Sequence, residues 1–98
     1  MSYGRVMGLN IIDEETYARY REEMKPILKS FSGSFGYDFK IAEVIKSKTK
    51  NKINRVFTIE FPSEDVMNKF FNDPAYIDVK NRYFDASVDA KTVIATYE

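Results

Sequence analysis

The sequence predicts an α+β fold in which four strands and two helical regions follow one another in the order β-α-β-β-α-β. In four short segments apolar side chains alternate or cluster in the manner of strands. Two other segments begin at capping residues and carry apolar side chains at spacings of three and four, which is typical of amphipathic helices. This order predicts one antiparallel sheet with helices on a single face.

The first strand is expected at residues 4–12, which are rich in Val, Met, Leu and Ile. Asp13 follows as a helix N-cap, because its carboxylate can accept hydrogen bonds from free backbone N–H groups. Pro26 lacks a backbone N–H, so we expect a kink or break in the helix near residues 22–25. Gly33 is expected to end the helix in the left-handed conformation. The apolar stripe of this helix consists of Tyr17, Tyr20, Met24, Leu28 and Phe31.

The second and third strands are expected at residues 35–46 and 55–61, where side chains alternate with period two. Between them, the polar and lysine-rich residues 47–54 are expected to form a hairpin tip. The residues expected to share a face are Phe35, Tyr37 and Phe39 on the second strand, and Phe57, Ile59 and Phe61 on the third.

The second helical region is expected to be broken in two. Pro62 ends the third strand and Ser63 caps a short helix, and Asp73 with Pro74 then starts another. The last strand is expected at residues 91–97. The order completed in this way is that of the ferredoxin-like fold, and we expect it to form a single domain over residues 1–98. The stripe of the last helix consists of Tyr76, Ile77, Lys80, Tyr83 and Phe84.

The face of the sheet away from the helices is expected to bind a second copy of the chain. On the last strand Thr92 and Ile94 alternate with Val93 and Ala95, so neither face carries strong charge. A sheet with two partly apolar faces is best explained by sheet-to-sheet association. We therefore expect a homodimer formed through the sheet face.

The amino-acid composition limits which partners, metals and cofactors the protein can use. The chain has 15 basic and 15 acidic residues, whereas nucleic-acid binders usually carry a basic excess, so we expect no nucleic-acid partner. Without cysteine or histidine, thiolate and imidazole chemistry is excluded, and we expect neither metal nor cofactor. The apolar runs are too short to span a bilayer, and the start of the sequence lacks the pattern of a signal peptide. We therefore expect no membrane partner and a cytoplasmic location.

Several short motifs resemble those of a known family. They are Asp13 with Tyr17 and Tyr20, the glycine turn at Gly33, the run Ile59-Glu60-Phe61-Pro62-Ser63, and Asp73-Pro74-Ala75-Tyr76 followed by Lys80. In these motifs the chain resembles the dimeric α+β barrel superfamily and, within it, the small domain-of-unknown-function branch numbered thirteen-thirty. The resemblance implies a dimeric ferredoxin-like fold and no settled activity. Other members of the superfamily include cofactor-free monooxygenases that act on aromatic substrates.

Glu60 is the candidate catalytic residue, because a lone carboxylate in mid-sheet must be paired, exposed or functional. The alternative is a cross-strand or intersubunit ion pair with Arg55, Lys40 or Lys91. Four tyrosines are expected to line a ligand cavity, or alternatively to pack in the core, and two basic residues could hold an anion, or alternatively face solvent. These candidate ligand-binding residues are Tyr17, Tyr20, Tyr37, Tyr76, Lys80 and Arg82.

Two hypotheses of function follow from this sequence. The first is a homodimer that binds or transforms a small organic molecule in a tyrosine-lined cavity. The alternative is a structural or sensory dimer without a functional pocket, and the sequence leaves open whether the protein is an enzyme. Nucleic-acid binding on the sheet would need exposed rings and a basic face. This hypothesis is ruled out if the rings of Phe35, Tyr37 and Phe39 are buried in a dimer.

Overall fold

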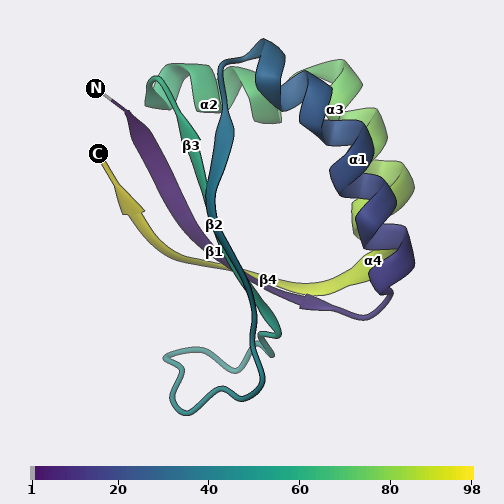
Figure 1. The fold of residues 1–98 in the computed structure, drawn as a ribbon, viewed down its shortest axis with the longest axis vertical. Coiled ribbons are helices and arrows are strands. Elements are labelled where there is room, and N and C mark those ends of the chain that lie inside the picture. Colours follow the sequence, from purple (N-terminus) through teal and green to yellow (C-terminus); the bar gives the residue numbers. More distant parts are fainter. Residues whose placement is uncertain (1) are drawn as a thin grey trace.

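Residues 2–98, which the computed structural model of the chain describes, form a four-stranded antiparallel sheet with helices on one face (Figure 1). The strand order β2-β3-β1-β4 confirms the predicted ferredoxin-like α+β fold. The strands are β1 (Tyr3–Ile11), β2 (Ser34–Lys40), β3 (Arg55–Phe61) and β4 (Val88–Tyr97). The helices are α1 (Glu14–Ser30), α2 (Glu64–Phe71), α3 (Pro74–Val79), the π-helical turn η1 (Lys80–Phe84) and α4 (Asp85–Ser87).

The three predicted helix caps are confirmed. The Asp13 carboxylate accepts a hydrogen bond from the Thr16 N–H at 3.1 Å, which starts α1. The Ser63 hydroxyl accepts from the Val66 N–H at 3.2 Å and starts α2. The Asp73 carboxylate accepts from the first N–H groups of α3. Each cap satisfies a donor that has no partner inside its helix, so these residues fix where the helices begin.

The left-handed residue at the end of α1 is Ser32, with φ of 58°, and the prediction of Gly33 is wrong. Two backbone bonds close the helix: Ser32 N–H donates to Lys29 O and Gly33 N–H to Leu28 O, both at 2.9 Å. Gly33 is required for a different reason. A Cβ there would lie 2.9 Å from Phe61 Cε1 and closer still to the Leu28 side chain. Its lack of a side chain therefore lets the turn lie against the core.

Three further expectations differ, and the first is the start of the last strand, which begins at Val88 and not at residue 91. Helix α1 is continuous through Pro26 and is not broken before it. Pro26 and Glu22 are both exposed, so the carbonyl that loses its helical partner faces water. Strand β2 ends at Lys40, which pairs with the first residue of β3, and residues 41–54 form a loop. The strand cannot extend to residue 46 because it has no partner strand beyond this point.

A bulge in β2 breaks the alternation that the sequence predicts. The pairing with β3 shifts between Phe35 and Asp38. Phe35 faces the helices, where its ring meets Phe57 with the centroids 5.6 Å apart. Tyr37 and Phe39 face the other way, stacked on each other at 5.9 Å and exposed. The expectation that all three β2 rings share one face is therefore wrong.

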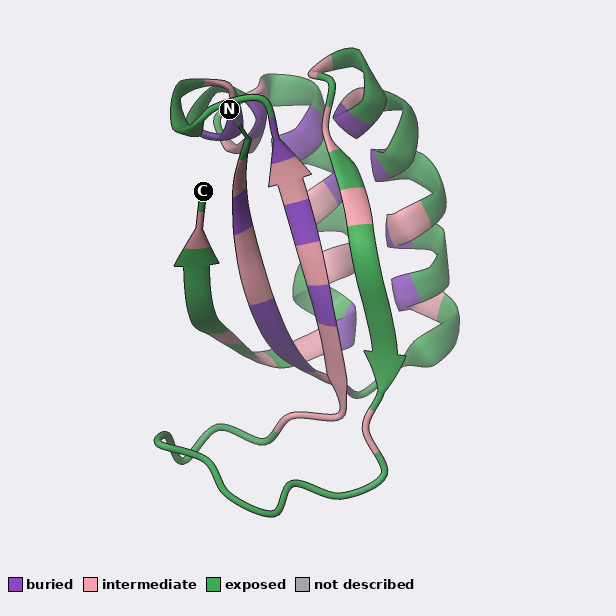
Figure 2. Cartoon of the chain, turned by 60° about the vertical axis from the view of Figure 1, so that its left-hand side comes forward, coloured by how far each residue is buried: buried purple, intermediate pink, exposed green. Residues whose placement is uncertain are grey.

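The core lies between the helices and the sheet, and the opposite face of the sheet carries a second set of side chains. We call this opposite side the outer face. Figure 2 shows that β2 and β4, at its two edges, are mostly exposed, whereas β1 and β3 between them are more buried. None of the helices within residues 2–98 is long and apolar enough to cross a membrane. The outer face consists of Val6, Tyr37, Phe39, Val56, Thr58, Glu60, Ala95 and Tyr97.

Candidate functional site

A cavity of about 300 Å³ lies between the sheet and the helices. The sheet contributes Met7, Leu9 and Ile59 to its walls, and the helical layer contributes Phe71 and Phe84. A volume of this size lies at the low end of the range for pockets that bind small molecules, and such pockets are typically apolar with a few polar groups. The cavity therefore has the size and character of a site for a small organic molecule.

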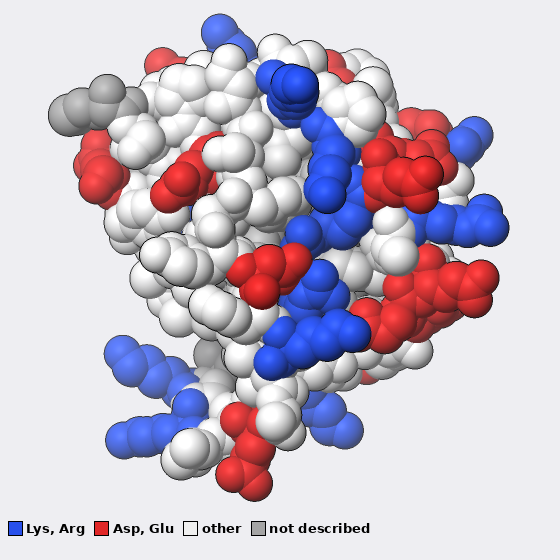
Figure 3. Space-filling view, in the orientation of Figure 1, with Lys and Arg blue, Asp and Glu red and all other residues white. Residues whose placement is uncertain are grey.

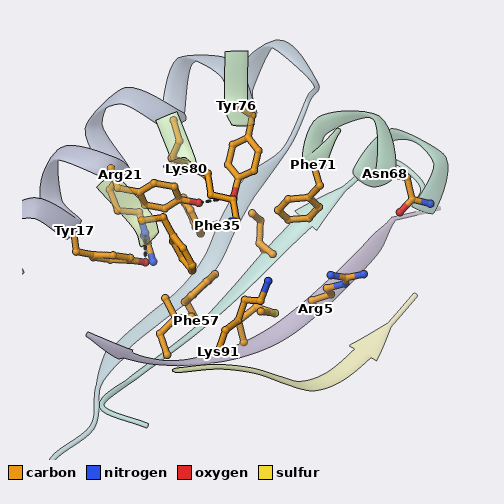
Figure 4. Close-up of a pocket in the computed structure, with 16 residues that line it drawn as sticks. Arg5, Tyr17, Arg21, Phe35, Phe57, Asn68, Phe71, Tyr76, Lys80 and Lys91 are labelled. Carbon is orange, nitrogen blue, oxygen red and sulfur yellow. Dashed lines mark hydrogen bonds between the residues drawn. The ribbon is translucent and has the colours of Figure 1, made fainter. Parts of the chain in front are cut away.

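Tyrosine hydroxyls form one polar side of the cavity. The Tyr20 and Tyr76 hydroxyl oxygens lie 2.8 Å apart, joining α1 to α3 (Figure 4). The Tyr17 hydroxyl accepts a hydrogen bond from Arg21 Nε at 2.7 Å. Within the Tyr20–Tyr76 pair, one O–H donates to the other, so the proton of the second hydroxyl is available to another acceptor.

Burial determines the protonation of these phenols. It raises the pKa of Tyr20 well above its ordinary value, and the neighbouring Tyr76 raises it further. Burial also raises the pKa of Tyr76, and that of Tyr17 despite the opposing charge of Arg21. The ordinary tyrosine pKa is already about 10, so all three are neutral near pH 7. They therefore act as hydrogen-bonding hydroxyls and not as phenolate bases.

The raised pKa of Tyr20 predicts a loss of stability at high pH. Above about pH 10 the unfolded chain releases the Tyr20 proton while the folded chain keeps it. The unfolded state then binds fewer protons, so the free energy of unfolding falls as pH rises. We expect Tyr20→Phe to make this fall shallower, as measured by urea unfolding between about pH 8 and pH 11. Tyr37→Phe, at an exposed ring, is the control. Equal slopes for wild type and Tyr20→Phe would contradict the prediction.

Basic side chains form the other polar side of the cavity. Among residues 2–98, those that line it include Arg5, Arg21, Lys80 and Lys91 and no acidic residue. Lys80 Nζ donates to Asp85 Oδ1 at 3.0 Å, and Arg21 is paired outside the cavity. Neither Arg5 nor Lys91 forms an ion pair or side-chain hydrogen bond with any residue that the structure describes. The charges on these two side chains are thus unbalanced within the described chain.

Two buried guanidinium nitrogens lack acceptors. Arg5 Nε and Arg21 Nη2 have no hydrogen-bond partner within residues 2–98. The Arg5 guanidinium lies 5.7 Å from the centroid of the Phe71 ring, and that of Arg21 lies 4.0 Å from the Phe35 centroid. Buried donors are nearly always paired in folded proteins, so an unpaired one calls for an explanation. A ligand or water in the cavity would supply the missing acceptor.

A cluster of charges at the edge of the cavity joins α1 to the sheet. Arg55 donates to both Asp38 oxygens, at 2.8 and 2.9 Å, and Arg21 Nη1 donates to Asp38 at 3.2 Å. The hydrogen bond from Arg55 is the main cause that lowers the pKa of Asp38. Figure 3 shows a band of basic side chains along this seam between helices and sheet. The cluster fixes Arg21 in place beside Phe35 and is a structural support for the cavity wall.

The structure brings some of the predicted site residues together and not others. Tyr17, Tyr20, Tyr76 and Lys80 all line the cavity. Tyr37 lies on the outer face, because the β2 bulge turns it away from the helices. Arg82 is exposed and lies 3.5 Å from Asp78 on the same helical stretch, outside the cavity. Whether the lining residues hold a ligand stays a prediction.

Glu60 lies on the outer face, on the side of the sheet opposite the cavity. Its carboxylate accepts a hydrogen bond from the Tyr97 hydroxyl at 2.7 Å. Among residues 2–98 of one chain, Glu60 forms no ion pair with Arg55, Lys40 or Lys91, and Arg55 faces the helices and binds Asp38. An intersubunit pair stays a prediction. Gly4 lies opposite Glu60, and the Tyr97 ring packs across it, which allows this hydrogen bond. The catalytic role of Glu60 stays a prediction, and its place is the face expected to meet a second copy.

Sequence reasoning missed four polar residues that line the cavity: Arg5, Arg21, Asn68 and Lys91. Arg5 shares a face of β1 with Met7, Leu9 and Ile11, which are all buried. A lone cation in an apolar row was a usable signal, because a buried charge needs a partner. Lys91 gave no comparable signal, since it lies opposite Leu9 only through the pairing of β4 with β1.

Comparison with solved structures supports the fold. A protein of unknown function from Rhodopseudomonas palustris matches with a TM-score of 0.82 at 16% identity, covering 98% of this chain and 80% of that chain. A dabb family protein with a ferredoxin-like fold from Mesorhizobium loti matches with a TM-score of 0.67 at 15% identity, covering 99% and 95%. A dimeric protein of unknown function with a ferredoxin-like fold from Bacteroides fragilis has a TM-score of 0.61 at 12% identity, covering 99% and 95%.

At these identities the likeness establishes the fold alone. No match was found among curated proteins. The family model described as "Domain of unknown function (DUF1330)" matches residues 5–97. The resemblance seen in the sequence motifs is thereby confirmed, and the chain belongs to the DUF1330 family.

Proposed function

We propose that the protein is a homodimer in which each subunit binds a small organic molecule in the cavity between the helices and the sheet. The observation that carries this proposal is the combination of an apolar cavity of about 300 Å³ with buried donors that lack acceptors. A core filled only for stability would leave neither the space nor the unpaired nitrogens, because both cost free energy. The predicted cytoplasmic location stays a prediction.

The outer face supports the dimer. Tyr37 and Phe39 are stacked there with 66% and 53% of their surface exposed, which is unusual for neighbouring rings. Val56 on β3 and Val6 on β1 lie on the same face, between the two stacked rings of β2 and the edge strand β4. Two proteins with a similar fold, one from Bacteroides fragilis and one from Thermobifida fusca, are described as dimeric. A second copy placed face to face would remove these rings from water.

Binding is better supported than catalysis. The titratable groups that line the cavity are tyrosines with raised pKa, arginines and lysines, which near pH 7 donate hydrogen bonds. Glu60, the candidate catalytic acid or base, is separated from the cavity by the sheet. A set of donors around an apolar space suits the recognition of an oxygen-bearing ligand.

Native mass spectrometry of the freshly purified protein tests the proposal. We expect a dimer that carries additional small-molecule mass, and we expect denaturing mass spectrometry to release that mass. In a Met7→Trp variant the larger side chain would project from β1 into the cavity. The variant should remain a folded dimer and lose the bound mass, because a filled space cannot hold a ligand.

Ile77→Trp is the matched control, since Ile77 is exposed on α3 and does not line the cavity. It should keep both the dimer and the bound mass. A dimer with no added mass, and with no affinity for any compound in a screen of small organic molecules, would favour the structural or sensory dimer. A monomer at all concentrations would contradict the proposed assembly.

A further inference from the structure

We infer that the ligand of the cavity is an organic carboxylate with a small apolar body, and that Arg5 and Lys91 hold its carboxylate. The inference rests on the proposed function and adds the chemical class of the ligand. It starts from the charges around the cavity, which are positive without a balancing acid among the described lining residues.

The four basic side chains are not equivalent. Arg21 is held by Asp38 and by the Tyr17 hydroxyl, and Lys80 is held by Asp85. Within residues 2–98, only Arg5 and Lys91 line the cavity without a carboxylate of the chain beside them. These two therefore have charge to offer an incoming anion.

The positions of these two residues suit one anionic group. Lys91 on β4 lies opposite Leu9 of β1, and Arg5 is four residues along β1 from Leu9. Both are long side chains that project from the sheet into the cavity (Figure 4), so an anion between them could be reached by both. The guanidinium offers a planar fork that matches two carboxylate oxygens, and the ammonium adds a point charge. Arg5 Nε is buried and lacks an acceptor within the described chain, so a carboxylate would satisfy it.

The remaining lining defines the body of the ligand. Phe57 and Ile59 on the sheet, and Phe71 above Arg5, present apolar surface next to the cations. The Tyr20–Tyr76 pair has one hydroxyl proton to donate to an oxygen at another point of the ligand. A cavity of about 300 Å³ leaves room for one ring or a short branched chain with its carboxylate.

Isothermal titration calorimetry with acid and amide pairs tests the inference. The probes are benzoate, phenylacetate and 3-phenylpropionate, each compared with its primary amide, which has nearly the same shape and no charge. We expect at least one acid to bind at least about tenfold more tightly than its amide, because hydrogen bonds between charged groups are the stronger ones. Added salt should lower the affinity of the protein for the acid and leave its affinity for the amide unchanged.

Arg5→Gln should reduce the affinity for the acid by about tenfold or more and leave that for the amide nearly unchanged. Lys91→Gln, on an exposed edge strand, provides the same test at a position that should tolerate substitution. Arg82→Gln is the matched control, because Arg82 is exposed and outside the cavity. It should bind as wild type does.

The outcomes separate the two proposals. If the amides bind as tightly as the acids, or if Arg5→Gln and Lys91→Gln both keep the preference for the acid, the inference is overturned and the small-molecule cavity stands. If neither acids nor amides bind, and no compound binds in the broader screen, the inference and the proposed function fall together.

Discussion

A Phe39→Glu variant is expected to be monomeric at concentrations where the proposed wild-type dimer would form. Phe39 is half-exposed in the single chain and stacks on Tyr37 at the edge of the outer face. In a face-to-face dimer the introduced carboxylate would be buried without a partner. Two-fold symmetry would repeat this cost in the other subunit. We expect the dissociation constant of the dimer to rise by roughly a hundredfold or more.

Sedimentation equilibrium over a range of concentrations measures this shift. Ile77→Glu is the control, since it introduces the same charge at an exposed apolar residue of the helical layer. It should remain as dimeric as wild type. Circular dichroism of each variant separates dissociation from unfolding. A Phe39→Glu protein that is folded and fully dimeric would place the interface elsewhere.

Replacing Phe70 with alanine is expected to lower the free energy of unfolding by about 3–5 kcal/mol. Phe70 has 0% of its surface exposed, and four aromatic rings have centroids within 4.4 to 5.8 Å of its own. The nearest of these rings belongs to Tyr76, whose hydroxyl reaches the cavity. The truncation removes a large apolar side chain and leaves a void that the packed neighbours cannot fill.

Urea unfolding at a fixed protein concentration measures this loss, because association also changes apparent stability. Phe70→Leu keeps most of the apolar volume and should cost clearly less than Phe70→Ala. Ile77→Ala, at an exposed position of α3, should cost about 1 kcal/mol or less. A loss of under about 1 kcal/mol for Phe70→Ala would show that these rings do not form a tightly packed cluster.

Features decided by local chemistry could be predicted from the sequence. Asp13, Ser63 and Asp73 start the helices as expected, because each cap acts on N–H groups two or three residues away. The alternation of side chains in β3 correctly predicted which of its faces is buried, because that strand is regular and paired on both sides. The helical spacing of Tyr17 and Tyr20 likewise placed both rings on the face of α1 that meets the cavity.

Features that depend on distant pairing could not be predicted. The bulge that separates Phe35 from Tyr37 is set by how β2 meets β3. Gly36 lies within it and is a local signal for a bulge, but a glycine alone does not fix which side chains turn to the other face. The cavity depends on how far the helices stand from the sheet. Lys91 therefore enters the site only once β1 and β4 are paired, whereas Arg5 lies on the buried face of β1 by alternation alone. The left-handed residue is Ser32, whereas Gly33 is required by its close packing against Leu28 and Phe61, which is a tertiary contact that the local pattern does not reveal.

The irregular pairing at both edges of the sheet also bears on aggregation. Strand β2 carries its bulge at one edge, and β4 at the other edge pairs with β1 through two shifts in register. A regular exposed edge is a template on which further strands can add without limit, whereas bulges interrupt the row of free backbone groups and twist the strand. The proposed self-association through the outer face would be closed after two subunits, whereas strand addition at an edge is open-ended. We therefore expect the two irregular edges to disfavour fibre growth in a small protein whose outer face carries exposed aromatic rings.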